Sequence, residues 1–455
     1  MKMKNIILSL LMVLSTSALA QVPTGDVLFK GGTVLTVSNG TLENTDVLVR
    51  DGKIQRIGRD LRAPRGVETI DITGKFLMPG IIDAHSHIAG SAINEGTSQV
   101  TAEVSMEDVV DPYDVSIYRA LAGGVTSIHL MHGSANVIGG QNETMKLRYG
   151  QTDPDMLRFE GAPRTIKFAL GENPTRGGRA RGIQPQSRMG VENMLRTSFQ
   201  QAVEYKKKWD AYNADSNPRK LAPEYDLRMQ TLVDIMNGDV WVNCHSYRAD
   251  EIYMLMKVFS DFGINKINFQ HANEAFKVAP ELAAFGATAS VFADWWAYKL
   301  EVYYSTAYNA AILHENGVLT SINSDSGELI RHLFHEAAKT QKYGNLSDDE
   351  ALAMVTLNPA KQLGIDGRVG SIEEGKDADI AIFDGHPLSV YAIPVMTFVD
   401  GVKYFDKAND ASDQRLYVDP ESSIEEITIF NREEMHRCME GAEFLNFEYL
   451  FSNQK

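Results

Sequence analysis

From Phe76 onward, apolar runs of strand length alternate with amphipathic runs of helix length. This alternation favours a parallel α/β architecture, because neighbouring parallel strands need a crossover connection that is usually a helix. Eight candidate strands predict a closed (β/α)8 TIM barrel, a fold that typically takes about 250 residues. The expected strands are 76–87, 125–131, 144–148, 164–170, 239–245, 266–271, 287–292 and 317–325. The expected helices are 114–122, 187–209, 249–262, 302–315 and 328–343.

Both flanks of this region have a different character. Residues 26–75 contain short β-rich runs separated by Asn39-Gly40 and Asp51-Gly52, which are strong hairpin signals. Residues 368–384 return to strands and turns. We therefore predict a small β-sandwich domain formed from both chain ends. The expected boundaries are a signal peptide at 1–20, the N-terminal β-sandwich segment at 21–75, the barrel at 76–364, the C-terminal β-sandwich segment at 365–405 and a tail without an assigned role at 406–455.

The first twenty residues have the pattern of an export signal. A basic start at Lys2 and Lys4 precedes an apolar run from Ile6 to Leu14, and the segment ends in Ser17-Ala-Leu-Ala20. These are the three regions of a secretory signal peptide. We expect cleavage after Ala20 and a periplasmic or secreted protein.

Composition narrows the choice of partners. The formal net charge is −16, which argues against nucleic acid or an anionic membrane as a partner. We expect a small-molecule substrate, and a homo-oligomer is compatible with the sequence. Only Cys244 and Cys438 occur, too few for a disulfide scaffold, and Cys244 is expected to be a buried packing thiol.

The first barrel strand ends in two histidines, His85 and His87. Side chains alternate along a strand, so both imidazoles face one side, about 7 Å apart along the backbone. An isolated His-x-His pair is more often structural than metal-binding, but four later strand ends also carry ligand-type groups. These groups are Lys167, His245, His271 and Asp325. Because barrel strands end at one mouth, we predict a metal site there. Asp325 alone would also suit a helix cap before Glu328.

These residues resemble the amidohydrolase superfamily, and specifically its imidazolonepropionase-like branch of exported metal-dependent amidohydrolases and dipeptidases. The resemblance covers about residues 26–405. Its most specific motifs are Pro79-Gly-Ile-Ile-Asp-Ala-His-Ser-His87, Asn358-Pro-Ala-Lys-Gln-Leu-Gly364 and Gly370-Ser-Ile-Glu-Glu-Gly-Lys-Asp-Ala-Asp379. The resemblance implies a (β/α)8 barrel with a β-sandwich. It also implies a metal site formed by His85, His87, His245, His271 and Asp325, and a carboxylated Lys167 where two metals are present.

Zinc suits these ligands, because it binds imidazole and carboxylate and lowers the pKa of its bound water to about 7. We expect hydrolysis of an amide-type C–N bond by metal-bound hydroxide, with Asp325 shuttling the proton. The substrate would be a dipeptide, an N-acyl amino acid or a cyclic amide. Two ions are favoured, one held by His85, His87 and Asp325 and the other by His245 and His271, with carboxylated Lys167 between them. In the one-ion alternative, His85, His87, His245 and Asp325 bind the ion and His271 polarises the carbonyl.

Arginines gather after the fourth strand, in a segment expected to be a loop. They are Arg176, Arg179, Arg181 and Arg188, and Tyr247 and Arg248 follow His245. Arginine binds carboxylates bidentately, so we predict a substrate carboxylate bound by Arg176, Tyr247 and Arg248. The alternative is a solvated basic loop. The rival function is a catalytically inactive binding or scaffold protein on the same fold.

Overall fold

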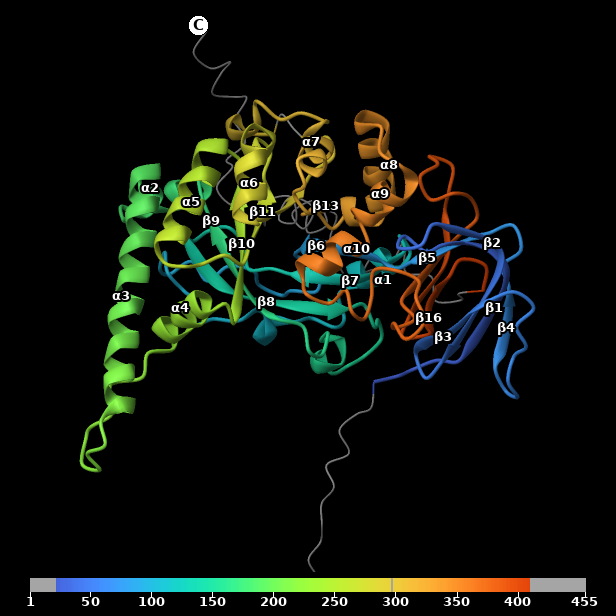
Figure 1. Cartoon of the computed structure of the whole chain (residues 1–455), viewed down its shortest axis with the longest axis horizontal. Coiled ribbons are helices and arrows are strands. Elements are labelled where there is room, and N and C mark those ends of the chain that lie inside the picture. The colour runs from blue at the N-terminus through green and yellow to red at the C-terminus, as the bar shows by residue number, and fades with distance from the viewer. Residues whose placement is uncertain (1–21, 296–297, 410–455) are drawn as a thin grey trace, which may run out of the picture.

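The structure is a computed structural model that describes residues 22–295 and 298–409. The predicted signal peptide, Cys438 and most of the C-terminal tail lie outside these residues. Two eight-stranded sheets form the body of the protein. The smaller β-domain lies beside the barrel, and the long helix α3 (Arg188–Ala214) lies on the opposite side of the barrel (Figure 1).

The barrel sheet has the strand order β13-β12-β11-β10-β9-β8-β7-β6. Its strands are β6 (Ile81–Ser86), β7 (Val125–Leu130), β8 (Ile138–Lys146), β9 (Arg164–Ala169), β10 (Val240–Ser246), β11 (Ile267–His271), β12 (Thr288–Val291) and β13 (Thr320–Ile322). The Asp325 N–H donates to the His85 carbonyl at 3.1 Å, which brings the last strand's exit next to the first strand. The barrel is therefore nearly closed, which agrees with the predicted TIM-barrel class.

The direction of one barrel strand differs from the prediction. β8 pairs antiparallel with both β7 and β9, whereas residues 144–148 were expected to form a parallel strand. The connection from Leu130 to Ile138 is too short for the crossover that a parallel strand requires. The chain therefore turns back directly, and no helix separates the second and third strands.

Helices connect most of the remaining barrel strands. They are α1 (Val115–Leu121), α2 (Glu172–Arg181), α3, α4 (Leu227–Asn237), α5 (Ala249–Asp261), α6 (Ala279–Phe285), α7 (Asn309–Glu315), α8 (Leu333–Gly344), α9 (Asp348–Ala353) and α10 (Leu357–Gln362). The expected loop that contains Arg176 is wrong, because α2 begins directly after Gly171 and ends at Arg181, with Gly182 as its C-cap. The expected helices 302–315 and 328–343 were too long, since each begins with a separate 3₁₀ turn.

The small sheet combines the two ends of the described chain. It has the order β16-β15-β14-β5-β1-β2-β3, and β4 pairs with β1. Its strands are β1 (Val27–Leu35), β2 (Thr41–Arg50), β3 (Lys53–Gly58), β4 (Glu68–Asp71), β5 (Phe76–Pro79), β14 (Ile380–Phe383), β15 (Pro394–Val399) and β16 (Val402–Asp406). The single strand expected over 76–87 is therefore two strands in different sheets. They separate at Gly80, where a Cβ would collide with the Thr126 side chain.

A buried charge cluster joins the two sheets. Lys146, at the end of β8, is fully buried and its Nζ lies 2.8 Å from Asp377, 3.1 Å from Asp379 and 2.5 Å from Asp400. Arg148 pairs with the other oxygen of Asp400 at 2.7 Å. The acidic residues belong to the small domain, so these contacts tie that domain to the barrel. None of the helices in the described ranges is both long and apolar enough to cross a membrane.

Candidate metal centre

The C-terminal ends of β6 and β13 bring a carboxylate against two imidazoles. Asp325 Oδ1 lies 3.5 Å from His85 Nε2 and 3.3 Å from His87 Nε2. One ligand atom from each of these three residues lies within 4.8 Å of the other two. His85 and His87 sit on the same face, as strand alternation predicts. This geometry brings three of the predicted metal ligands into coordinating distance of one point.

His245 and His271 extend the cluster from the neighbouring strands β10 and β11. Their ring centroids are 4.7 Å apart, and the His271 ring is 4.6 Å from that of His85. His271 Nε2 lies 3.5 Å from the second oxygen of Asp325. All five predicted ligands therefore converge at the mouth of the barrel, with the Asp325 carboxylate between them.

Neighbouring groups orient the first two histidines. His85 Nδ1 lies 3.1 Å from the amide oxygen of Gln270, whose nitrogen donates to Asn243. His87 Nδ1 lies 2.9 Å from the Met131 carbonyl. Each Nδ1 therefore donates, which leaves the Nε2 lone pair directed at the cluster. Metal-binding histidines usually show this arrangement, with the second nitrogen held by an oxygen.

Buried imidazole nitrogens without hydrogen-bond partners indicate whether a metal ion suits this site. Both ring nitrogens of His245 and of His271 are buried without a hydrogen-bond partner among the described residues. Such groups are rare in native proteins and call for an unseen partner. Imidazole nitrogens together with a carboxylate form a donor set that suits Zn²⁺. The residues present therefore fit a divalent metal.

Lys167 also points at this cluster from β9. It is fully buried, and its Nζ lies 3.0 Å from His85 Nε2 and 3.7 Å from the Met131 sulfur. Glu172 follows Lys167 closely in the chain, but it forms an ion pair with Arg176 at 2.8 Å. Lys167 thus takes the position expected of the bridging residue.

Electrostatics favour the protonation states that metal binding requires. Burial lowers the pKa of His85 and of His245 well below the usual range, and lowers that of His271 to about 3 despite the opposing charge of Asp325. Burial alone would raise the pKa of Asp325. The nearby imidazoles of His271 and His87 outweigh this effect and lower that pKa to about 2. The site therefore holds neutral imidazoles and an ionised carboxylate.

Two of these residues have an unusual backbone conformation. His271 has φ 64° and Asp325 has φ 48°, both in the left-handed region that side chains other than glycine rarely adopt. Such strain costs on the order of 1–3 kcal/mol per residue and concentrates at functional sites. His271 is the last residue of β11, and Asp325 lies in the segment that follows β13.

Comparisons with known proteins agree with this geometry. Residues 301–411 match the amidohydrolase family. The solved structure of an amidohydrolase from Thermotoga maritima MSB8 is 33% identical and has a TM-score of 0.78. It covers 84% of this chain and is itself matched over 100% of its length. The chain belongs to the amidohydrolase family.

Two curated relatives extend this comparison. Amidohydrolase tasK from Hapsidospora irregularis is 32% identical over 79% of this chain, and the chain spans only 40% of that relative's length. Imidazolonepropionase from Thermoplasma volcanium is 24% identical over 75% of this chain and 84% of its own length. The predicted resemblance to the amidohydrolases and their imidazolonepropionase-like branch is confirmed.

Aromatic rings form one wall of the amidohydrolase site. Tyr247 stacks on His271 with ring centroids 5.4 Å apart, and Phe292 stacks on the same imidazole at 4.9 Å. The Tyr298 hydroxyl donates to the Tyr247 hydroxyl at 3.0 Å. Lys299 Nζ lies 4.4 Å from the centre of the Tyr247 ring, so its ammonium group forms a cation–π contact with this wall. Tyr247, predicted to bind substrate, thus lies beside the predicted ligands.

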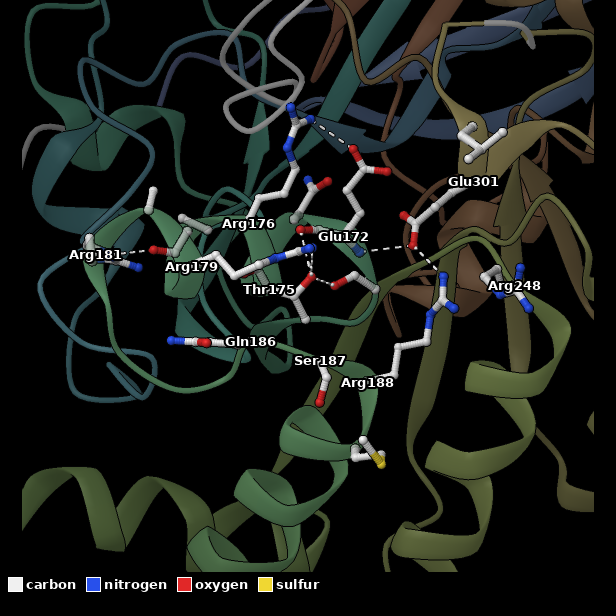
Figure 2. Close-up of a pocket in the computed structure, with 17 residues that line it drawn as sticks. Glu172, Thr175, Arg176, Arg179, Arg181, Gln186, Ser187, Arg188, Arg248 and Glu301 are labelled. Atoms are coloured by element: carbon white, nitrogen blue, oxygen red, sulfur yellow. Dashed lines mark hydrogen bonds and ion pairs between the residues drawn. The ribbon is translucent and has the colours of Figure 1, made fainter.

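A separate cavity of about 1260 Å³, which we call the arginine pocket, has none of the predicted metal ligands in its lining (Figure 2). It is lined by α2, the start of α3, Arg248, Leu300 and Glu301. Arg176 and Arg248, the two arginines predicted to bind substrate, both line it. Each already has an acidic partner in the amidohydrolase, Glu172 for Arg176 and Asp250 for Arg248. Their charges are therefore partly neutralised.

One residue of this amidohydrolase centre was missed in the sequence, and several other histidines lie outside the cluster. The orienting role of Gln270 was missed, although a polar amide directly before a strand-end histidine is a usable signal. His129 and His132 are buried next to the site but bond to Thr165 and to Gly133 instead. His332 and His335 stack on each other, and His332 lies near Glu328, in the segment that enters α8. Cys244 is buried, as expected.

Proposed function

We propose that this protein is a zinc-dependent hydrolase that cleaves an amide-type C–N bond in a small molecule. The observation that carries the proposal is the convergence of buried imidazoles with unpaired nitrogens on one ionised carboxylate. The site opens where barrel enzymes place their chemistry, at the C-terminal ends of the strands. Membership of the amidohydrolase family supports the same reaction class.

His85, His87 and Asp325 would hold one zinc ion, and His245 and His271 a second one. When bound, zinc supplies Lewis-acid chemistry, since it lowers the pKa of a coordinated water and polarises a carbonyl oxygen. We propose that Lys167 Nζ bonds to the carbon of CO2 and releases a proton, which makes an anionic carbamate. An uncharged amine is expected here because a buried ammonium facing metal ions would be disfavoured. The one-ion arrangement, without carbamate, remains the alternative.

The side chains of the chain would handle the proton and the substrate. Asp325, ionised and directed at the cluster, would accept the proton of the attacking water and deliver it to the leaving nitrogen. In the one-ion arrangement, His271 would instead polarise the reacting carbonyl from its position between Tyr247 and Phe292. A free carboxylate on the substrate would balance the cations at the mouth, which include Lys299 and the arginine pocket. We also propose that the protein is exported and acts in the periplasm or outside the cell.

The test is metal-dependent turnover. Full-length protein stripped with a chelator and reloaded with zinc would be offered dipeptides, N-acyl amino acids and cyclic amides. We expect turnover in at least one class, lost on chelation and restored by zinc. Tight zinc binding without turnover of any class would favour the scaffold alternative. Turnover that is insensitive to chelation would contradict the proposed chemistry.

A further inference from the structure

The arginine pocket carries more positive charge than its own carboxylates neutralise. Five arginines line it, against two glutamates, Glu172 and Glu301, in a protein whose formal net charge is −16. Its volume of about 1260 Å³ exceeds the roughly 300–1,000 Å³ of a typical small-molecule site. A concentration of guanidinium groups in one cavity of an acidic protein attracts anions to that cavity.

Three of these arginines are held by the protein itself. Arg176 pairs with Glu172 and Arg248 with Asp250, while Arg188 lies 3.3 Å from both Glu251 and Glu301. Glu301 in turn accepts a hydrogen bond from the Glu172 N–H at 3.0 Å. The charges of these three side chains are therefore balanced by carboxylates of the protein itself, as Figure 2 shows for Arg176 and Arg188.

Arg179 and Arg181 differ from the other three. Across residues 22–295 and 298–409, neither forms an ion pair with a carboxylate. Arg179 donates to the Thr175 carbonyl and hydroxyl at 3.3 and 3.4 Å, and Arg181 donates to the Gly177 carbonyl at 3.1 Å. Both side chains are exposed within the pocket lining. These local bonds orient each guanidinium and leave further N–H groups available, since arginine has five donors.

The pocket borders the metal centre through a short series of contacts. Asn173 lines the pocket and accepts a hydrogen bond from Lys299 Nζ at 2.8 Å. The same Nζ lies over the ring of Tyr247, which stacks on His271. In addition, α2 begins only a few residues after Lys167. The arginine pocket is therefore separated from the predicted ligands by Lys299 and Tyr247.

Apolar groups also line the cavity. Met189 and Leu300 are 80% and 84% exposed, so two large apolar side chains face solvent beside the arginines. Exposed apolar side chains in a cavity commonly mark a ligand-contacting surface. The lining thus suits a molecule that carries both an acidic group and an aliphatic part.

We propose that the arginine pocket is the specificity subsite for an acidic side chain, with Arg179 and Arg181 binding its carboxylate. The inference rests on the proposed hydrolase function and assigns its substrate class, which is acidic peptides and related amides with an aliphatic portion. Charge-assisted hydrogen bonds from two guanidinium groups distinguish a carboxylate from the neutral amide of the same shape.

The test compares the dipeptides Leu-Glu and Leu-Gln, which differ in this charge alone. With zinc-loaded full-length protein, we expect kcat/KM to favour Leu-Glu by about tenfold or more, the difference that one charge-assisted contact typically provides. In the double variant Arg179→Met/Arg181→Met the preference should fall to within about threefold. The control Arg56→Met/Arg219→Met removes the same charge at exposed positions outside the pocket and should keep the preference.

A binding measurement separates this inference from the proposed reaction. Calorimetry with metal-stripped protein should show Leu-Glu binding more tightly than Leu-Gln, and the pocket variant alone should lose that difference. If binding follows this pattern but no dipeptide is cleaved, the pocket stands and the proposed hydrolysis is wrong. If the pocket variant keeps its preference, or the wild type has none in either assay, the acidic subsite is wrong.

Discussion

Lys167 Nζ lies 3.0 Å from His85 Nε2, and both side chains are fully buried. A lysine this close to an imidazole nitrogen directed at the metal centre is well placed to supply a carbamate ligand. Lys167→Ala should therefore reduce bound zinc from two ions to one or none and lower kcat by about a hundredfold or more, a typical loss for a positioned catalytic group. Metal analysis and steady-state kinetics measure both effects.

Short-chain carboxylic acids provide the control for this variant. Acetate or propionate in the cavity left by Lys167→Ala can replace the carbamate oxygens and should restore some of the activity and the second ion. Unchanged zinc content and full activity in the untreated variant would exclude the bridge and favour the one-ion arrangement.

Asp325 touches the predicted ligands on both sides, with contacts of 3.3 to 3.5 Å to His85, His87 and His271. Asp325→Asn keeps the shape and tolerates the positive φ, because asparagine enters the left-handed region more readily than most residues. We expect a folded protein whose kcat is lower by about 10²–10⁴-fold. Circular dichroism and kinetics with saturating zinc check the fold and the rate. Retention of more than about a tenth of wild-type kcat would remove Asp325 from the proton-transfer role.

Two lysines contact the same carboxylate in different surroundings. Lys146 and Lys53 each lie 2.8 Å from an oxygen of Asp377, but Lys146 is fully buried while the Lys53 side chain is 55% exposed. Lys146→Met would leave Asp377, Asp379 and Asp400 buried together without their central cation. We expect it to cost about 3–5 kcal/mol of unfolding free energy. The matched Lys53→Met should cost about 0–1 kcal/mol.

Urea denaturation of both variants at neutral pH measures this contrast. Losses of similar size would mean that the barrel and the small domain do not depend on the buried cluster. A large loss only in Lys146→Met would show that burial, and not the ion-pair distance, determines the contribution.

The carboxyl group of Glu251, away from the metal centre, should make the folding stability depend on pH. Burial and the negative charges of Glu301 and Asp250 raise the pKa of Glu251 from 4.5 to about 7. The positive charges of Arg188, at 3.3 Å, and Arg248 oppose this rise. The folded state therefore binds a proton that the unfolded state has released, between about pH 4.5 and 7. This group's contribution to stability is present below that window and is lost as pH rises through it.

Glu251→Gln removes the ionisation and keeps the size of the side chain. The stability of this variant relative to wild type should rise between pH 5 and pH 8, by roughly 2–3 kcal/mol as an order of magnitude. Urea denaturation at several pH values follows the difference. Parallel curves for the two proteins would mean that Glu251 is already ionised in the folded state at pH 5.

Local rules in the sequence were sufficient for the barrel and for the positions of its ligand-type residues. Strand alternation places His85 and His87 on one face, and the strand-to-helix rhythm puts Lys167, His245, His271 and Asp325 at strand ends. Parallel strands in a barrel share one mouth, so these residues had to meet once the fold formed.

Tertiary structure alone decided the direction of β8, the orienting role of Gln270 and whether each arginine pairs with a carboxylate. Whether Arg176 or Arg179 is available to a ligand depends on which carboxylates lie beside it, and Glu172 and Glu301 are brought together from distant regions of the chain. Ion pairing and burial depend on distances between elements, whereas periodicity describes only the residues within one element. The sequence therefore determined which groups reach the mouth, and packing determined which of them remain free to act.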